Sequence, residues 1–168
     1  MSREPIVNRV AKSALINIDL ADHPPKNPVV SLDLSLFLEQ GLILREKDFR
    51  AQLSELDKST YNDAYVHVFC STQAIVPAWA YQLVATTLSE SADKVLVCNA
   101  DTFKVILWAD HIAQLDLSAY QDGLVLLKGC TDQDIPQAAY TLLAQRLTGV
   151  VKKLMFGEAC SFVPLHKN

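Results

Sequence analysis

A strand–cysteine–loop–proline–helix–strand pattern occurs twice, over about residues 64–98 and 123–157, and constrains the fold more than any other feature. Each copy begins with an apolar run of strand length and then reaches a cysteine, Cys70 in the first copy and Cys130 in the second. A proline next begins a helix, a position where its missing N–H costs no hydrogen bond. A second short apolar run follows each helix. Each copy therefore predicts a strand–helix–strand unit, the usual connection between parallel strands.

The likeness of the two copies extends to individual residues. From the prolines onward they align at a constant offset of 59 positions, and seven identities fall within about 20 positions, where chance would give one or two. Convergence of two helices on common helix residues is the alternative, but cysteine, proline and tyrosine recur in the same order. We interpret the pattern as an internal duplication. The identical pairs are Pro77/Pro136, Ala80/Ala139, Tyr81/Tyr140, Leu83/Leu142, Ala85/Ala144, Leu88/Leu147 and Lys94/Lys153.

Strands and helices are also expected outside the repeated units. The sequence predicts strands within residues 14–20 and 29–34, a helix over about residues 45–56, and an extended tail over residues 160–165. Continuous apolar strands that alternate with helices are typical of a largely parallel sheet covered by helices. We therefore expect a single α/β domain over residues 1–168, with a β-rich N-terminal extension ahead of the duplicated units.

The composition argues against several classes of protein. Half of the residues are apolar and 20% are charged, which is enough for a buried core and unlike a disordered chain. The net charge of -4 is spread along the sequence, without the basic stripe of a nucleic-acid-binding protein. No apolar run approaches the length of a membrane span, and the N-terminus lacks a secretory signal. We expect a cytoplasmic protein with reduced thiols that binds neither nucleic acid nor membrane.

Three cysteines are the candidate metal ligands. On neighbouring parallel strands, Cys70 and Cys130 would lie at the same edge of the sheet, where a following helix N-terminus favours a thiolate. Cys160 follows the last strand after a short turn that would let it fold back over this edge. With His67, Asp132 or an exogenous group as a fourth ligand, these thiols match the donors of a zinc site or a three-cysteine iron–sulfur site.

Two other interpretations of the cysteines stay open. The chain has no C-x-x-C motif, and free cysteines commonly pack as small hydrophobic residues, as they would in a non-catalytic interaction module. A thiol redox protein would instead cycle a disulfide between Cys70 and Cys130, which requires an exposed sulfur with a lowered pKa. We assign Cys98, at the end of an apolar strand, to the core. Tyr81 and Tyr140 either pack against the sheet, which is the favoured interpretation, or reach the strand-end edge with their hydroxyls.

Motifs of common enzyme classes are missing from the sequence. It contains no G-x-x-x-x-G-K-[ST] loop, no G-x-G-x-x-G and no G-x-S-x-G elbow, and only five glycines in all. The sequence therefore names no catalytic residue and leaves open whether the protein is an enzyme.

Segments along nearly the whole chain resemble a bacterial family of unknown function, domain-of-unknown-function family 2480. The likeness lies in Cys70–Tyr81, Lys128–Cys130 and Leu154–Leu165, and Ile6–Ala11 and Lys47–Arg50 are similar as well. The resemblance implies no established activity. Genes of this family lie near those for iron–sulfur cluster assembly, so the resemblance implies a link to that assembly. It therefore favours the metal hypothesis and a protein partner in cluster assembly. A homodimer is the default expectation for a chain of this kind.

Overall fold

The structure, a computed structural model, describes residues 15–129, 135–158 and 160–168. These residues form an α/β fold with mostly parallel strands, which confirms the predicted fold class. The chain divides into two compact units. Lys26–Leu107 form the central unit, and the residues up to Pro25 together with Trp108–Asn168 form the terminal unit. The expectation of a single domain stays a prediction.

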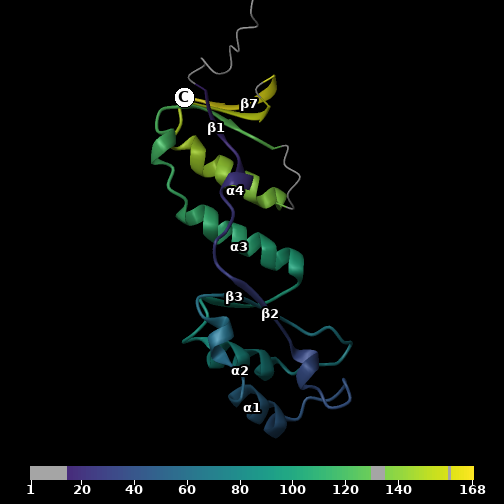
Figure 1. Cartoon of the computed structure of the whole chain (residues 1–168). Coiled ribbons are helices and arrows are strands. Elements are labelled where there is room, and N and C mark those ends of the chain that lie inside the picture. The colour runs from purple at the N-terminus through teal and green to yellow at the C-terminus, as the bar shows by residue number, and fades with distance from the viewer. Residues whose placement is uncertain (1–14, 130–134, 159) are drawn as a thin grey trace, which may run out of the picture. The chain divides into compact units, whose positions relative to one another are not determined.

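The central unit contains a sheet of three parallel strands. These are β2 (Val29–Asp33), β3 (Tyr65–Phe69) and β4 (Lys94–Val97), in the order β2-β3-β4. Helix α1 (Glu46–Ser54) lies between β2 and β3 in the sequence, and α2 (Ala78–Leu88) connects β3 to β4. The strand–helix–strand connection predicted for the first repeated unit is therefore present, with α2 on one side of the sheet (Figure 1).

The core of the central unit lies between its sheet and its helices. Alternate strand residues point to this side because side chains along a strand alternate between the two faces. Phe49 on α1 is fully buried there and makes edge-to-face contacts with the rings of Phe37 and Trp79. The other buried members include Leu32, Val66 and Val68 from the strands and Leu53, Ala80, Val84 and Leu88 from the helices.

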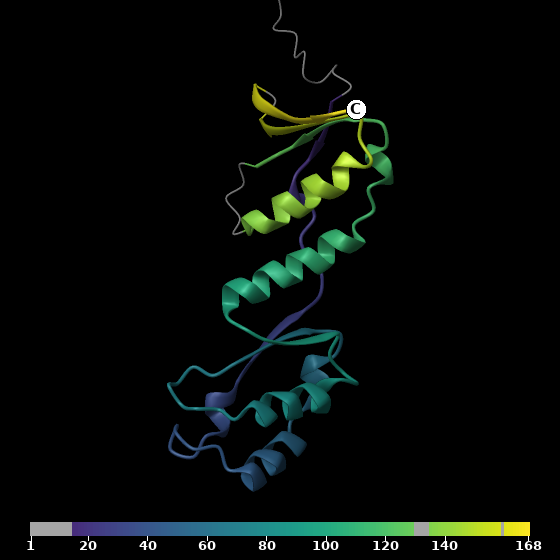
Figure 2. The ribbon, with the colours of Figure 1, turned by 180° about the vertical axis from the view of Figure 1, so that it is seen from behind.

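The terminal unit contains a sheet of four strands, β1 (Leu15–Ile18), β5 (Leu124–Leu127), β6 (Lys153–Glu158) and β7 (Ser161–Lys167). Their order is β1-β5-β6-β7; the first three are parallel, and β7 runs antiparallel to β6. Helix α4 (Gln137–Thr148) connects β5 to β6 and packs against one face of this sheet (Figure 2). The extended tail predicted from the sequence is present as β7.

Helix α3 (Ala100–Gln114) spans the division between the two units. Up to Leu107 it belongs to the central unit, and from Trp108 it belongs to the terminal unit, whose core contains Trp108 and Ile112. The guanidinium of Arg146 on α4 donates hydrogen bonds to carbonyls near the C-terminal end of α3, including one of 2.9 Å to the Leu115 oxygen. None of the described helices has the length and apolar character needed to cross a membrane.

Short 3-10 helices precede or follow strands in both units, and aspartates stabilise them. Each aspartate accepts a hydrogen bond from a backbone N–H at the start of the turn, which satisfies a donor that the helix itself cannot. The 3-10 helices are η1 (Leu20–Asp22), η2 (Leu34–Phe37), η3 (Lys58–Tyr61) and η4 (Ser118–Tyr120), and the aspartates are Asp19, Asp33, Asp57 and Asp116.

Hydrogen bonds recur in the two units at the sequence offset of 59. The turn before β3 and the turn before β5 each hold an aspartate with a positive φ, 55° at Asp63 and 54° at Asp122. Their amides donate to Ser91 O and Val150 O, both at 2.9 Å. The register is also shared, because Tyr65 lies beside Lys94 as Leu124 lies beside Lys153. The interpretation as a duplication stays a prediction, and these matched contacts support it.

Candidate functional site: a strand-end cavity with two thiols

A cavity of about 690 Å³ opens at the carboxyl ends of β3 and β4 in the central unit. Ligands in open α/β sheets gather at this end of the strands. The polar side chains that line the cavity are Ser31, His67, Cys70, Tyr81, Cys98 and Asn99. We call this space the thiol cavity, because Cys70 follows β3 directly and Cys98 follows β4 directly.

Cys70 shares the thiol cavity with the hydroxyl of Tyr81. Its side chain is half-buried, and Sγ lies 3.4 Å from Thr72 Oγ1 in the loop that follows. Burial raises the pKa of the Tyr81 hydroxyl, and the negative charge of the Cys70 thiolate raises it further. Both effects favour the protonated form of the Tyr81 hydroxyl, which can donate a hydrogen bond. Tyr81 packs on the core of the central unit and also lines the cavity, so both interpretations of this residue agree with its position.

Cys98 is half-buried, and burial raises the pKa of its thiol. The backbone at this residue is held by His67, whose Nε2 lies 2.8 Å from Cys98 O. A carbonyl oxygen only accepts hydrogen bonds, so Nε2 carries the proton, and Nδ1 has the lone pair in the neutral ring. His67 thus connects β3 to the end of β4.

Two aromatic rings hold His67 in place. Its ring stacks on Phe69 at a centroid distance of 5.0 Å, and Phe103 from α3 lies 4.9 Å away. A histidine that is stacked in this way and hydrogen-bonded to a carbonyl has a restricted orientation. Its first role in the structure is to position Cys98, and its role as a fourth metal ligand stays a prediction.

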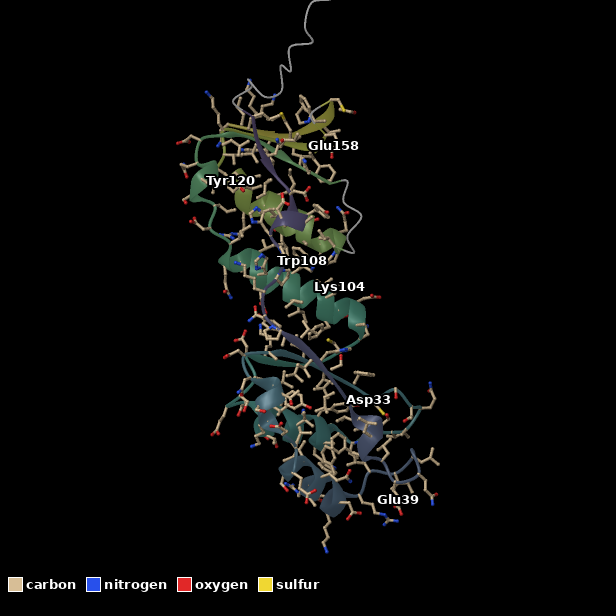
Figure 3. All side chains as sticks on the ribbon, in the orientation of Figure 1. Asp33, Glu39, Lys104, Trp108, Tyr120 and Glu158 are labelled. Carbon is tan, nitrogen blue, oxygen red and sulfur yellow. The ribbon has the colours of Figure 1, made fainter. Side chains whose placement is uncertain are left out.

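Asp33 anchors the loop that begins with Cys70. Its Oδ1 accepts hydrogen bonds from the backbone N–H of Ser35 at 2.9 Å and from that of Ser71 at 3.0 Å. The Ser71 hydroxyl donates to the Ser35 hydroxyl at 3.0 Å. Figure 3 shows Asp33 where β2 ends. The residue directly after Cys70 is therefore attached to the neighbouring strand, which restricts where Cys70 can lie.

These hydrogen bonds lower the pKa of Asp33 from 3.8 to about 2. Burial acts in the opposite direction and raises the pKa, but the bonds from Ser71 and Ser35 outweigh it. We expect Asp33→Asn to lower the free energy of unfolding by about 1 kcal/mol at pH 7, since solvent screening reduces the full value of such a shift. Chemical denaturation followed by circular dichroism measures the loss.

The effect of Asp33 on stability depends on pH with a defined sign. Because its pKa is lowered in the folded state, its stabilisation is complete above the unfolded value of 3.8 and is lost as the pH falls through about 2. The difference between the parent protein and Asp33→Asn should therefore shrink over that range. Asp19→Asn is the matched control, because within the described parts of the chain the Asp19 side chain accepts just the local bond from Ala21 N. An equal loss in both variants would contradict the anchoring role of Ser71.

The structure places the predicted metal ligands in both units. Cys70 lies in the central unit, and Cys160 is exposed in the terminal unit, between β6 and β7. Cys130 and Asp132 lie outside the described residues. Strands β3 and β5 belong to different sheets, so strand pairing does not bring Cys70 and Cys130 to one edge. The three-cysteine site stays a prediction.

Two observations concern the described cysteines and their neighbours. Cys70, Cys98 and Cys160 are free thiols. Within the parts of the chain that the structure describes, no group of three or more histidine, cysteine, aspartate or glutamate side chains is arranged to hold a metal ion.

The assignment of Cys98 to the core was wrong, because this residue lines the thiol cavity. The sequence contained a signal for this position. Cys98 directly follows a strand and precedes a helix, as Cys70 does with a longer loop, so the rule applied to Cys70 also covered it. The short apolar strand before Cys98 favoured the core assignment instead.

The comparison with protein families agrees with the resemblance found in the sequence. The family model described as "Protein of unknown function (DUF2480)" matches residues 4–168. The chain belongs to this family. No curated protein and no solved structure matches the chain. Membership of the family brings no activity with it, so the function has to be argued from the thiol cavity.

Proposed function

We propose that the chain binds a thiophilic metal ion in the thiol cavity through Cys70 and Cys98, as an accessory in iron–sulfur cluster assembly or transfer. The observation that supports this proposal is that Cys70 and Cys98 are both lining residues of one open cavity at the ends of adjacent parallel strands. Thiolates are preferred ligands of zinc and of iron in iron–sulfur clusters. The proposal requires a reducing compartment such as the cytoplasm, where thiols persist.

Metal binding at this site would release protons. Two thiols and one divalent ion give two metal–sulfur bonds and two protons, since the thiolate is the ligand. Because burial raises the pKa of Cys98, the proton competes well with the metal, and affinity should rise with pH. The remaining coordination positions would be filled by water or by an exogenous ligand. Exchangeable positions of this kind suit a protein that passes its metal on to a partner.

The neighbouring side chains would support this chemistry. The Tyr81 hydroxyl would donate a hydrogen bond to the Cys70 sulfur, which stabilises a thiolate. His67 would hold the backbone of Cys98 through the bond to its carbonyl oxygen. Asp33 would restrict the Cys70 loop from the other side.

Substitution separates this proposal from the three-cysteine hypothesis. The two share Cys70, but the first requires Cys98, whereas the second requires Cys130 and Cys160, with His67 or Asp132 as a possible fourth ligand. The protein would be purified without oxygen and analysed for zinc, iron and acid-labile sulfide. Titration with Co²⁺ then reports thiolate ligation through the sulfur-to-cobalt absorption band.

We expect Cys70→Ser and Cys98→Ser each to weaken Co²⁺ binding by more than about 100-fold. Loss of a residue that only supports a ligand weakens metal binding by up to about 100-fold, and loss of the ligand itself should weaken it more. Cys160→Ser is the matched control and should bind as the parent protein does, because Cys160 does not line the cavity. Loss of metal in Cys130→Ser and Cys160→Ser with full binding in Cys98→Ser would favour the three-cysteine site. A parent protein that takes up neither metal nor cluster would favour the interaction module.

A further inference from the structure

Strand β4 lies at an edge of the central sheet, whereas the corresponding strand of the terminal sheet does not. β4 pairs with β3 on one side, and no strand among the described residues pairs with its other side. At the offset of 59, β4 corresponds to β6, which pairs with β5 on one side and with β7 on the other. The terminal unit thus contains one strand more than the central unit at this edge.

The difference begins at one pair of corresponding residues. Gly157 in β6 has a φ of +128°, a value that residues with a side chain rarely adopt. The chain then turns back as β7. Cys98 stands at the corresponding position after β4, and Asn99 accepts a hydrogen bond from Thr102 N to begin α3. The chain therefore leaves β4 as helix α3, where the corresponding segment of the terminal unit turns back as a strand.

A groove lies between α2 and Val97, the last residue of this edge strand. It has a volume of about 240 Å³ and is lined mainly by apolar atoms of Ala78, Tyr81, Gln82, Ala85 and Val97. Val97 is 49% exposed, although it lies on the core side of its strand with Val95. An apolar edge of this kind attracts another strand unless it is protected.

The terminal unit contains the matching groove, and there a strand already covers the edge. Each of the five residues that line the groove beside β4 has a counterpart 59 positions later that lines the groove of the terminal unit. Leu165 of β7 lines the groove of the terminal unit as well. The corresponding residues are Gln137, Tyr140, Thr141, Ala144 and Phe156. The terminal unit thus indicates which element fits beside such a helix and edge strand. It is an antiparallel strand with an apolar side chain toward the groove.

We propose that the outer edge of β4 binds an extended segment of a partner protein, antiparallel to β4, with an apolar side chain in the groove beside Ala85. Main-chain hydrogen bonds to the strand edge supply affinity in such complexes, and side-chain pockets supply specificity. The segment would resemble β7 in chemistry, being short, extended and apolar at alternate positions. The groove shares Tyr81 and Val97 with the thiol cavity, so the test substitutes Ala85, which lines the groove and does not line the cavity.

A labelled peptide that copies residues 161–168 is the probe for this site. Fluorescence anisotropy with the full chain should show saturable binding, with a dissociation constant of about 100 µM or tighter. Ala85→Glu in the protein should weaken binding at least about tenfold, because a carboxylate in the groove loses its water without a partner. Thr86→Glu, on the neighbouring exposed position of α2, is the matched control and should bind as the parent does.

The remaining controls cover the peptide and the fold. A peptide with Leu165→Asp should lose binding, and the circular dichroism spectrum of Ala85→Glu should match that of the parent, which shows that the variant is folded. Absence of peptide binding, or equal binding by Ala85→Glu and the parent, would overturn the proposal. So would sedimentation of the parent as a dimer and of Ala85→Glu as a monomer, because a second copy would then cover the edge.

Discussion

Replacing Phe49 with alanine is expected to lower the free energy of unfolding by about 4 kcal/mol, the largest effect of any single change considered for the central unit. The ring is fully buried, with Phe37 at a centroid distance of 5.3 Å and Trp79 at 5.9 Å, both edge-to-face. Alanine would remove the apolar surface, leave a cavity and take away the ring contact that Phe37 and Trp79 each make with Phe49. Chemical denaturation followed by circular dichroism measures the loss.

Phe162→Ala is the matched control for Phe49→Ala. Phe162 is 44% exposed on β7, so the same loss of a phenyl ring should cost about 1 kcal/mol or less. Equal losses in the two variants would mean that Phe49 does not organise the core as its contacts indicate. The expected loss at Phe49 is a large fraction of the 5–15 kcal/mol that stabilises a typical domain.

Gly157→Ala is expected to lower the free energy of unfolding by about 3 kcal/mol. A Cβ at this position would lie 2.6 Å from Ser161 O, which belongs to the backbone of β7 and cannot move without breaking the pairing. The φ of +128° adds backbone strain for any residue with a side chain. The close contact and the backbone strain both destabilise the turn between β6 and β7.

Gly149→Ala is the matched control, since it makes the same substitution without either cause. Gly149 follows α4 with a φ of -81°, and a Cβ there would come no closer than 3.9 Å to Arg146 O. We expect a change within about 0.5 kcal/mol, or a slight gain from the stiffer unfolded chain. If Gly157→Ala were as well tolerated as Gly149→Ala, the hairpin would not depend on glycine, and the contrast with Cys98 would lose its basis.

The elements of the fold were largely predictable because their signals are local. Apolar runs such as Tyr65–Phe69 and Leu124–Leu127 predicted strands that the structure contains, and Pro77 and Pro136 directly precede α2 and α4 as expected. The tail expected to be extended is β7. Periodicity and proline geometry act over a few residues and are therefore visible in the sequence.

The candidate site was only partly predictable. Cys70 was identified from its place after a strand, and it lines the thiol cavity. Cys98 was missed, since a half-buried cysteine after a short apolar strand has the same local sequence as a core cysteine. The hydrogen bond from Ser71 N to Asp33 joins residues 38 positions apart, and no local sequence pattern predicts it.

The sequence by itself determined the alternation of strands and helices, the offset of 59 and the strand-end place of Cys70. The tertiary structure alone decided that β1 pairs with β5, that β2 pairs with β3, and that the strands therefore form two sheets. Among the described strands, it also decided that β4 pairs on one side only. The physical reason is that apolar strands are nearly interchangeable as pairing partners, so only the burial and backbone hydrogen bonds of the whole chain select among them.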